Sequence, residues 1–256
     1  PPSQHAALPI SSVANLDRLR DIGADRHEST LLDKNERTTP FPDHFLHELF
    51  ESITPQELIK YPDQSSLYKK LSEFLGLDSE NILLVSGSDS GIKIVFDTYA
   101  QPRDCVVTLF PSYAMEQVYI KMFDCQNIAI DFDYNLNLSL DSLLNAITPN
   151  IRIVLIANPN QPTGKSLTFH EIEQIAETAR QNSNAIIVID EAYLEFSNGK
   201  SSLPLVKQYP NLCVLRTFSK AWGLASVRLG YIAADPSVVN QLQKVKTLLD
   251  INLFAI

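Results

Sequence analysis

Seven short apolar runs, rich in β-branched residues, recur from residue 81 onward and constrain the fold of this chain more than any other feature. Most of the gaps between them have the pattern of helices, and one of these helices begins with a capping box of Thr168 and Glu171. Short apolar strands that alternate with helices predict an α/β fold, in which a mostly parallel seven-stranded sheet is flanked by helices on both faces. The runs are NILLVSG, DCVVTLF, NIAIDFD, IRIVLIAN, AIIVIDEAY, NLCVLRTF and LGYIAA.

The N-terminal part of the chain has a different pattern. Residues 1–44 show no sustained period and contain several prolines, so we expect an extended arm there and a large domain over residues 45–256. Before the first strand we expect helices in DHFLHELFES, in TPQELIKYP with a capping box of Thr54 and Glu57, and in SSLYKKLSEFLGL, which Gly76 would close. Because the chain begins without Met and ends at NLFAI, we also expect a fragment that is incomplete at its C-terminus.

The charge, the cysteines and the missing motifs argue against several classes of function. The formal net charge is −9, which argues against nucleic acid or an anionic membrane as the main partner. Cys105, Cys125 and Cys213 form no C-x-x-C pair, so we expect a reducing, cytoplasmic protein, and no apolar run approaches the length of a transmembrane helix. The five histidines lack a ligand cluster and there is no G-x-S-x-G motif, which disfavours a metal enzyme and a serine hydrolase.

One predicted strand end carries a lysine, and in parallel sheets the chemistry gathers at the carboxyl ends of the strands. In RTFSKAWGLASVRLGY, Lys220 follows the NLCVLRTF run, and small residues leave space beside it. A lysine held in an apolar pocket or near another cation loses its proton more readily, and the neutral amine is a nucleophile. Arg228 lies far enough along the chain to return to the same anion as Ser219.

Other strand ends carry polar or aromatic groups. Asp190 ends an apolar strand, where an ionised carboxylate is costly unless it is paired. The small residues around Ser88 and Asp89 could bring backbone N–H groups to an anion, although an ordinary strand-to-helix turn explains them equally well. Tyr113 could be a flat lid over a planar ligand, although on its own core packing explains it better. The loop NPNQPTG leaves its strand with several amides, which favours ligand binding.

These strand ends together require a ligand with an anion, a planar ring and a carbonyl that accepts an amine. They also require a ring nitrogen that a buried carboxylate keeps protonated. Pyridoxal phosphate has all of these features, and its ring withdraws electrons only while that nitrogen stays charged. The sequence therefore predicts a site for pyridoxal 5'-phosphate.

Six segments resemble, in order, the motifs of fold-type-I pyridoxal-phosphate aminotransferases, and most closely those of the histidinol-phosphate aminotransferase branch. The segments are KYP, VSGSDSGI, FPSYAM, NPNQPTG, IDEAYLEF and RTFSKAWGLASVRLGY, and the resemblance covers about residues 30–235. It implies the large domain of a pyridoxal-phosphate-dependent transferase. That family continues into a small C-terminal domain, which carries the Arg for the acid group of the substrate and is expected to be absent here.

The resemblance also implies roles for the matching residues. Lys220 is expected to form the Schiff base with the cofactor and to move the proton in catalysis. Asp190 would pair with the ring nitrogen, Tyr193 would bond the phenolic oxygen of the ring, and Tyr113 would stack on the ring. The residues implied for the phosphate group are Ser88, Asp89, Ser219 and Arg228.

Substrate-side and partner contacts follow from the same resemblance. Asn35 and Glu36 resemble the Asn-Glu pair of the substrate-side arm. Tyr61 resembles the tyrosine that reaches the phosphate of the partner subunit, which implies a homodimer. The family usually has Asn immediately before P-T-G, where this chain has Gln161. The Gln161 amide can make the same contact with the ring oxygen, and Asn160 is the fallback.

The leading functional hypothesis is an aminotransferase that moves an amino group from an amino acid, glutamate, to a keto acceptor, for which the resemblance suggests imidazole-acetol phosphate. A pyridoxal-phosphate-dependent decarboxylase of the threonine-phosphate type shares the motifs and is the alternative among enzymes. A binding module without activity is the third hypothesis, favoured by the missing C-terminal part and disfavoured by the intact Lys220, Asp190, Tyr193 and Arg228.

Overall fold

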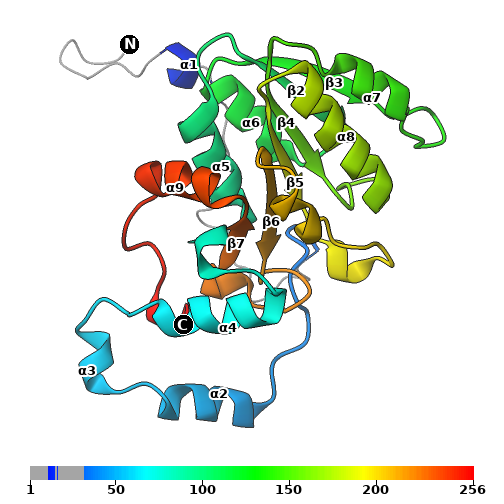
Figure 1. The fold of residues 1–256 in the computed structure, drawn as a ribbon. Helices are drawn as coiled ribbons and strands as arrows, with labels where there is room; N and C mark the ends of the chain where they lie inside the picture. Colours follow the sequence, from blue (N-terminus) through cyan, green and yellow to red (C-terminus); the bar gives the residue numbers. More distant parts are fainter. Residues whose placement is uncertain (1–10, 15, 17–31) are drawn as a thin grey trace, which may run out of the picture.

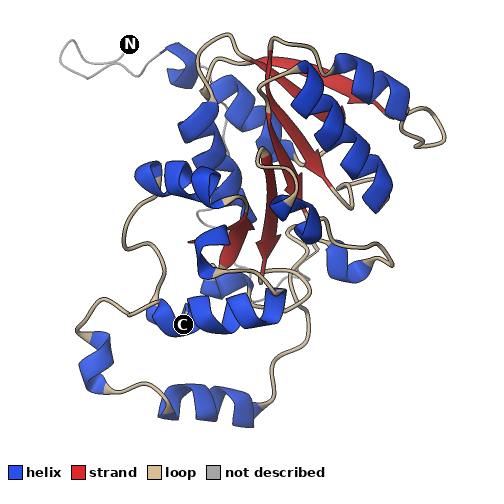
Figure 2. Cartoon of the chain, in the orientation of Figure 1, coloured by secondary structure: helices blue, strands red, loops and turns tan. Residues whose placement is uncertain are grey.

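The computed structural model of the chain describes residues 11–14, 16 and 32–256, and Figure 1 shows how their elements are arranged. Within these residues seven strands form one sheet, drawn red in Figure 2, in the order β1-β7-β6-β5-β4-β2-β3. β7 is antiparallel to β1 and β6, and the other neighbours are parallel, so the predicted mostly parallel sheet is confirmed. The strands are β1 (Ile82–Val85), β2 (Cys105–Phe110), β3 (Gln126–Asp131), β4 (Ile151–Ala157), β5 (Ile186–Asp190), β6 (Leu212–Thr217) and β7 (Gly230–Ala233).

The central strands face two apolar cores, because successive residues of a strand point to opposite sides of the sheet. In β5, Ile187 and Ile189 belong to the first core, and Ile186 and Val188 belong to the second. All residues of this strand are buried, as expected of a strand that is covered on both sides. Each Å² of apolar surface removed from water in these cores contributes about 25 cal/mol to folding.

Helices cover both faces of the sheet, as predicted. The first core includes side chains of α4 (Ser65–Leu75), α7 (Leu140–Ala146) and α8 (Phe169–Asn182). The second core includes side chains of α5 (Ser88–Tyr99), α6 (Ala114–Met122) and α9 (Pro236–Val245). Short 3₁₀ helices are η1 (Ser79–Asn81), η2 (Leu194–Phe196), η3 (Leu203–Lys207), η4 (Ala225–Val227) and η5 (Leu253–Ala255).

The helix ends predicted from the sequence are confirmed. In α8, the Thr168 hydroxyl accepts a hydrogen bond from the Glu171 N–H at 3.2 Å, and the Glu171 carboxylate accepts one from the Thr168 N–H at 2.6 Å. Thr54 and Glu57 form the same capping box. Gly76 ends α4 in the left-handed conformation, with φ of 64°.

Helices also occur before the sheet begins: α1 (Ser11–Ala14), α2 (Asp43–Glu51) and α3 (Pro55–Leu58). The expected extended arm differs from the structure at α1, because a single helical turn is too short to produce a sequence period. Residues 32–42 contain neither helix nor strand, and residues 1–10, 15 and 17–31 lie outside the described part of the chain. The division into an arm and a large domain stays a prediction.

After α9 the chain turns back and runs along one side of the molecule to its end beside α4, as the red segment of Figure 1 shows. Residues 246–252 lead from the helix that packs in the second core to η5. Ile251 and Ala255 are then buried in the first core. This return path brings the end of the chain close to the loops that follow β1 and precede β7.

Candidate active site

Strand direction brings several loops to one edge of the sheet. The carboxyl ends of β1, β2, β4, β5 and β6 lie at this edge, together with the start of the antiparallel β7. Gly230 at the start of β7 pairs with Val85 at the end of β1 and with Thr217 at the end of β6. Ala157 and Asp190 pair at the ends of β4 and β5. The loops that follow these residues therefore meet at one place, where ligands of open α/β sheets bind.

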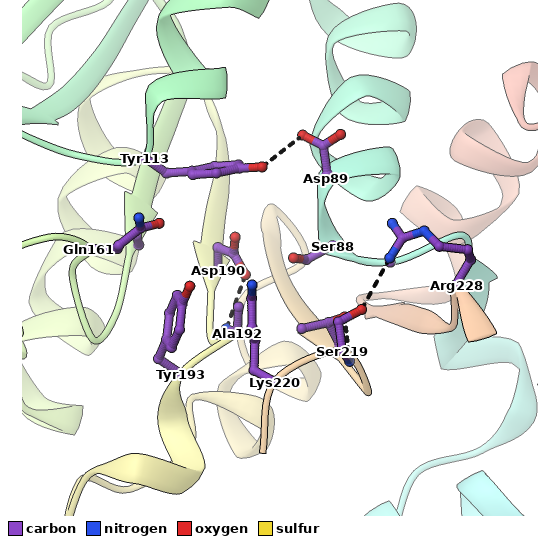
Figure 3. A pocket seen from close by; sticks show the side chains of 13 residues that line it. Ser88, Asp89, Tyr113, Gln161, Asp190, Ala192, Tyr193, Ser219, Lys220 and Arg228 are labelled. Carbon is purple, nitrogen blue, oxygen red and sulfur yellow. Dashed lines mark hydrogen bonds between the residues drawn. The ribbon is translucent and has the colours of Figure 1, made fainter. Parts of the chain in front are cut away.

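A pocket of about 150 Å³ lies at this edge, and Figure 3 shows it from close by. It gathers side chains from loops that are far apart in the sequence. The residues of this pocket that the sequence predicted are Ser88, Asp89, Tyr113, Gln161, Asp190, Tyr193, Ser219, Lys220 and Arg228. The lining residues that were not predicted as site residues are Gly87, Ala157, Ala192 and Thr217. Most of these residues are small. They leave space in the pocket, and their side chains carry no reactive group that would single them out in the sequence.

Lys220 lies on the loop after β6 and points toward the middle of the pocket (Figure 3). Its side chain is partly buried, and Nζ lies 5.6 Å from the centre of the Tyr193 ring. Nζ also donates a hydrogen bond of 2.7 Å to the carbonyl oxygen of Lys34, in the segment before α2. The amine is thereby held at the pocket by the N-terminal segment.

Asp190 is 6% exposed at the end of β5. The pKa of its carboxyl is raised from 3.8 to about 7, mainly by burial. The Ala192 N–H lowers this pKa, and the nearby carboxylates of Asp89 and Glu191 add to the rise. That N–H donates to Oδ1 at 3.1 Å. A positive group placed against Asp190 would restore the charged carboxylate, because opposite charges at short distance favour the ionised form.

Tyr113 forms the side of the pocket opposite Lys220 (Figure 3). Its hydroxyl donates a hydrogen bond of 3.4 Å to the carboxylate of Asp89. Burial raises the pKa of the Tyr113 hydroxyl, and the charge of Asp89 adds to this rise. The Asp89 side chain therefore orients Tyr113. A carboxylate repels an anion, so the backbone N–H of Asp89 is the part of this residue that suits the phosphate role implied by the resemblance.

Arg228 marks the end of the pocket that suits an anion. Its Nη1 donates to the Ser219 hydroxyl at 3.2 Å, and its Nη2 donates to the carbonyl oxygen of Ser86 at 2.9 Å. Gly87 has φ of 86°, and a Cβ at this position would lie 2.8 Å from Nη2. Helix α5 begins at Ser88, so its first backbone N–H groups face the same end and add to the attraction for an anion.

The residues predicted for the substrate side lie before α2. The Asn35 amide donates to the Tyr193 hydroxyl at 2.9 Å, which places Asn35 beside the pocket. Glu36 follows and is partly buried, but it does not line the pocket. Tyr61 lies in the connection between α3 and α4 with 76% of its surface exposed, and it does not line the pocket either. Its predicted contact with a partner subunit stays a prediction.

The two amides of the loop after β4 have different surroundings. Gln161 lines the pocket, as predicted from its place before Pro162. Asn160 is 3% exposed, and its amide donates to the carbonyl oxygen of Pro111 at 3.0 Å and to the Thr163 hydroxyl at 2.9 Å. The fallback residue is therefore engaged in holding the loop against the turn that precedes Tyr113.

A buried ion pair beside Asp190 was not predicted. Glu191 is fully buried, and its Oε2 lies 3.0 Å from Nη1 of Arg216. Burial raises the pKa of Glu191, while bonds from Ser202 and Ser201 and the charge of Arg216 oppose the rise. Arg216 also forms an ion pair with Glu195. Both of its partners are therefore side chains of the protein, and Arg216 does not line the pocket.

Glu116 on α6 was also missed. It is 1% exposed, and its Oε1 accepts a hydrogen bond of 2.9 Å from the Ser112 hydroxyl. Burial raises the pKa of Glu116 to about 8. The available signal was its position three and four residues before Tyr119 and Ile120, which share its helix face and are buried.

In the described part of the chain, no three His, Cys, Asp or Glu side chains gather as a possible metal site. Over those residues, no helix has the length and apolarity needed to cross a membrane.

The amine of Lys220 lies opposite the ring of Tyr113, and the carboxyl of Asp190 nearby has a raised pKa. Together they suit a flat carbonyl compound with a basic ring nitrogen. Arg228 adds the requirement for an anion. On this fold those requirements define the class of pyridoxal-phosphate-dependent transferases. The family described as "Aminotransferase class I and II" matches residues 30–249, and the chain belongs to that family.

Curated relatives are similar over most of this chain. The histidinol-phosphate aminotransferase of Christiangramia forsetii is 36% identical over 205 residues, which are 79% of this chain and 57% of the relative. Histidinol-phosphate aminotransferase 1 of Carboxydothermus hydrogenoformans is 37% identical over 227 residues, or 88% of this chain and 63% of the relative. The chain therefore spans less than two thirds of the length of these relatives.

Solved structures show the same fold. The histidinol-phosphate aminotransferase of Sinorhizobium meliloti, in complex with pyridoxal-5'-phosphate, has a TM-score of 0.78 at 22% identity, over 87% of this chain and 60% of that one. The enzyme of the same name from Clostridium acetobutylicum has a TM-score of 0.75 at 24% identity, over 86% of this chain and 65% of that one.

Proposed function

We propose that this protein is a pyridoxal-phosphate-dependent aminotransferase of the histidinol-phosphate type, which moves an amino group from an amino acid to a keto acceptor. The observation that carries the proposal is the pocket in which Lys220 and Arg228, from the connection between β6 and β7, meet Asp190 at the end of β5. Family membership supports the reaction type. The relatives named histidinol-phosphate aminotransferase support the substrate class.

The residues of the pocket fit this cofactor. Asp190 is buried with a pKa raised to about 7, so a protonated ring nitrogen would be a suitable partner for its carboxylate. The absence of a Cβ at Gly87 leaves space beside the guanidinium of Arg228, where a phosphate group needs close approach. Pyridoxal phosphate supplies an aldehyde that condenses with amines and a ring that draws electrons from the bonds of the attached carbon.

Each side chain of the pocket would have a separate role toward the cofactor. Lys220 would hold the cofactor through its amine and, when a substrate amine replaces it, would move a proton at Nζ. Asp190 would keep the ring nitrogen charged. Tyr193 and Gln161 would bond the ring oxygen, and Tyr113 would pack against the ring and exclude water from one side.

The phosphate end would rest on charge and on oriented N–H and O–H donors. Arg228 would provide the positive charge and the Ser219 hydroxyl one donor, both already joined by a 3.2 Å bond. The first backbone N–H groups of α5, at Ser88 and Asp89, would provide further donors. Such charge-assisted bonds are about twice as strong as neutral ones, so this end would contribute much of the affinity.

The proposal includes the two substrates and the assembly of the protein. The amino donor would be glutamate and the acceptor imidazole-acetol phosphate, with Asn35 and Glu36 on the substrate side. The protein would act as a homodimer in which the exposed Tyr61 reaches the phosphate end of the other subunit. The free thiols of its three cysteines support a reducing, cytoplasmic location.

The test is the visible absorbance of the purified protein with pyridoxal phosphate, before and after glutamate is added. We expect a yellow band that fades with glutamate and returns when the keto acceptor is supplied. The variant Lys220→Ala is the control and should give no protein-bound yellow band.

Each other outcome contradicts a stated part of the proposal. A band that glutamate leaves unchanged would contradict the transamination step, and no band would contradict the cofactor assignment. Release of carbon dioxide from threonine phosphate, without dependence on a keto acid, would replace transamination by decarboxylation.

A further inference from the structure

Residues 246–252, which we term the C-terminal strap, have a fixed shape. Lys246 starts the strap with a side chain that is only 3% exposed. Its ammonium group pairs with the carboxylate of Asp250 and donates to the carbonyl oxygen of Thr247 at 2.9 Å. A buried lysine is uncommon and needs such partners. Ile251, 2% exposed, then anchors the strap in the first core.

The strap is bonded to the residue that holds the guanidinium of Arg228. The Ser86 hydroxyl donates to the carbonyl oxygen of Asp250 at 3.2 Å and lies 3.5 Å from its carboxylate. The carbonyl oxygen of the same Ser86 accepts the 2.9 Å bond from Nη2 of Arg228. Ser86 therefore joins the strap to the arginine, on the turn that leads into α5.

A second bond reaches the backbone of the arginine. The Asn252 amide donates to the carbonyl oxygen of Val227 at 2.8 Å, directly before Arg228. Arg228 itself has φ of 57° and ψ of 53°, a left-handed conformation that is strained for a residue with a side chain. Strained residues of this kind persist where the surrounding structure holds them. The strap thus contacts the neighbourhood of Arg228 on its backbone side and on its side-chain side.

We propose that the C-terminal strap positions Arg228 for a phosphate group, with Ser86, Asp250 and Asn252 as positioning residues that do not touch the ligand. The inference rests on the proposed function in one respect, namely that the phosphate of pyridoxal phosphate binds at Arg228. The Lys246–Asp250 pair keeps the strap in shape and neutralises the Asp250 carboxylate, which would otherwise repel the phosphate from behind Ser86.

The test removes both links without changing any charge. The double variant Ser86→Ala, Asn252→Ala loses the hydroxyl bond to Asp250 and the amide bond to Val227, while the Ser86 carbonyl remains for Arg228. The dissociation constants of pyridoxal phosphate and of pyridoxal, which has no phosphate, are measured on each protein. We expect the preference for pyridoxal phosphate over pyridoxal to fall about tenfold, the size expected for two neutral hydrogen bonds.

A matched control is available at the opposite edge of the sheet. Ser183 donates its hydroxyl to the carbonyl oxygen of Ala179 at 3.1 Å, and Asn211 donates its amide to that of Ala185 at 3.1 Å. Ser183→Ala, Asn211→Ala removes bonds of the same kind, so it should lower thermal stability while leaving the preference for the phosphate unchanged. A role of the strap in folding alone would move stability in both double variants and the preference in neither.

The outcomes separate this inference from the proposed function. If the unaltered protein prefers pyridoxal phosphate and the strap variant keeps that preference, the inference is overturned and the proposed function stands. If the unaltered protein shows no preference, the phosphate does not bind at Arg228, and both are overturned. Should the double variant fail to fold, Ser86→Ala and Asn252→Ala are measured singly. Each should lower the preference about threefold, and an unchanged preference in both would overturn the inference.

Discussion

The side-chain amide of Asn35 donates a 2.9 Å hydrogen bond to the hydroxyl of Tyr193, across 158 residues of sequence. The neighbouring Lys34 accepts the 2.7 Å bond from the amine of Lys220. Two successive residues before α2 are thus bound to two residues of the pocket. Asn35 has φ of 53°, a left-handed conformation that asparagine tolerates better than most residues.

Replacing Tyr193 by Phe tests what its hydroxyl contributes. The variant loses the acceptor for Asn35 and the donor proposed for the ring oxygen of the cofactor, while the ring itself keeps its packing. We expect kcat to fall about tenfold and the absorption maximum of the bound cofactor to shift, since a hydrogen bond to a charged group is worth about 1.5–3 kcal/mol. The control is Tyr134→Phe, because Tyr134 is 100% exposed and lies outside the pocket. An unchanged band and rate in Tyr193→Phe would refute the contact.

Replacing Lys220 by Ala tests the amine. Borohydride reduction should attach the cofactor permanently to the unaltered protein, which then gains the mass of the cofactor. The variant should gain no such mass, because no other amine lines the pocket among the described residues. We expect kcat to fall by about 10²–10⁴, the usual contribution of a positioned acid–base group. Lys200→Ala, on an exposed loop, is the control and should behave as the unaltered protein does. Cofactor mass retained in Lys220→Ala would assign the attachment to a different lysine.

Much of the fold was predictable because its signals are local. Each strand is a short apolar run, and α3 and α8 begin with capping boxes, so these signals can be read without knowing the neighbours of each segment. The pocket followed from one further rule, that parallel strands gather their carboxyl ends. Lys220 and Asp190 stood out because charged side chains next to apolar strands need a reason.

The remaining features depend on distant partners. Nothing in the sequence near Asp89 indicates that its carboxylate binds Tyr113, because that bond joins two loops that meet only in the folded sheet. The contact of Asn35 with Tyr193 and the bond of Ser86 to Asp250 are of the same kind. The resemblance suggested where site residues lie along the chain, whereas these side-chain partners required the three-dimensional arrangement.

Replacing Gly87 by Ala tests the space around the guanidinium of Arg228. An added Cβ would lie 2.8 Å from Nη2, so the guanidinium must move away from Ser86 and Ser219. We expect weaker binding of pyridoxal phosphate, by tenfold or more, and little change for pyridoxal, since the loss concerns a charge-assisted bond.

The matched control for Gly87→Ala is Gly76→Ala. Gly76 also has a positive φ, of 64°, but a Cβ there would meet nothing within 4 Å. Gly87, with ψ of 164°, lies in a backbone region that is essentially restricted to glycine, whereas Gly76, with ψ of 32°, is in the left-handed region. Gly87→Ala should therefore lose more stability in thermal unfolding, and the binding of pyridoxal separates this general loss from the loss at the phosphate. Equal losses of pyridoxal phosphate affinity in both would show that strain, and not displacement of Arg228, is responsible.

In the protein without cofactor, the buried carboxyl of Glu116 should make the free energy of unfolding depend on pH. Burial raises its pKa from 4.5 to about 8, so the folded state holds a proton that the unfolded state has released over this interval. The folded state therefore binds more protons, and the free energy of unfolding decreases as pH rises from about 5 to 8, by at most about 1.4 kcal/mol per pH unit for this group. The stabilisation is complete at low pH and is lost as pH passes through the raised pKa.

The variant Glu116→Gln, measured by denaturant unfolding between pH 5 and 8, isolates this contribution. Asp190, with a pKa raised to about 7, and Glu191, also raised by burial, act in the same direction and remain in the variant. The slope should therefore become shallower throughout this interval, and Asp190, with a pKa of about 7, still contributes to the slope that remains. Glu177→Gln is the control, since the pKa of this exposed carboxylate is lowered to about 2 by its bonds to Arg180 and Gln181, outside the interval measured. An identical slope in Glu116→Gln and in the unaltered protein would mean that Glu116 is ionised in the folded state, in spite of its burial.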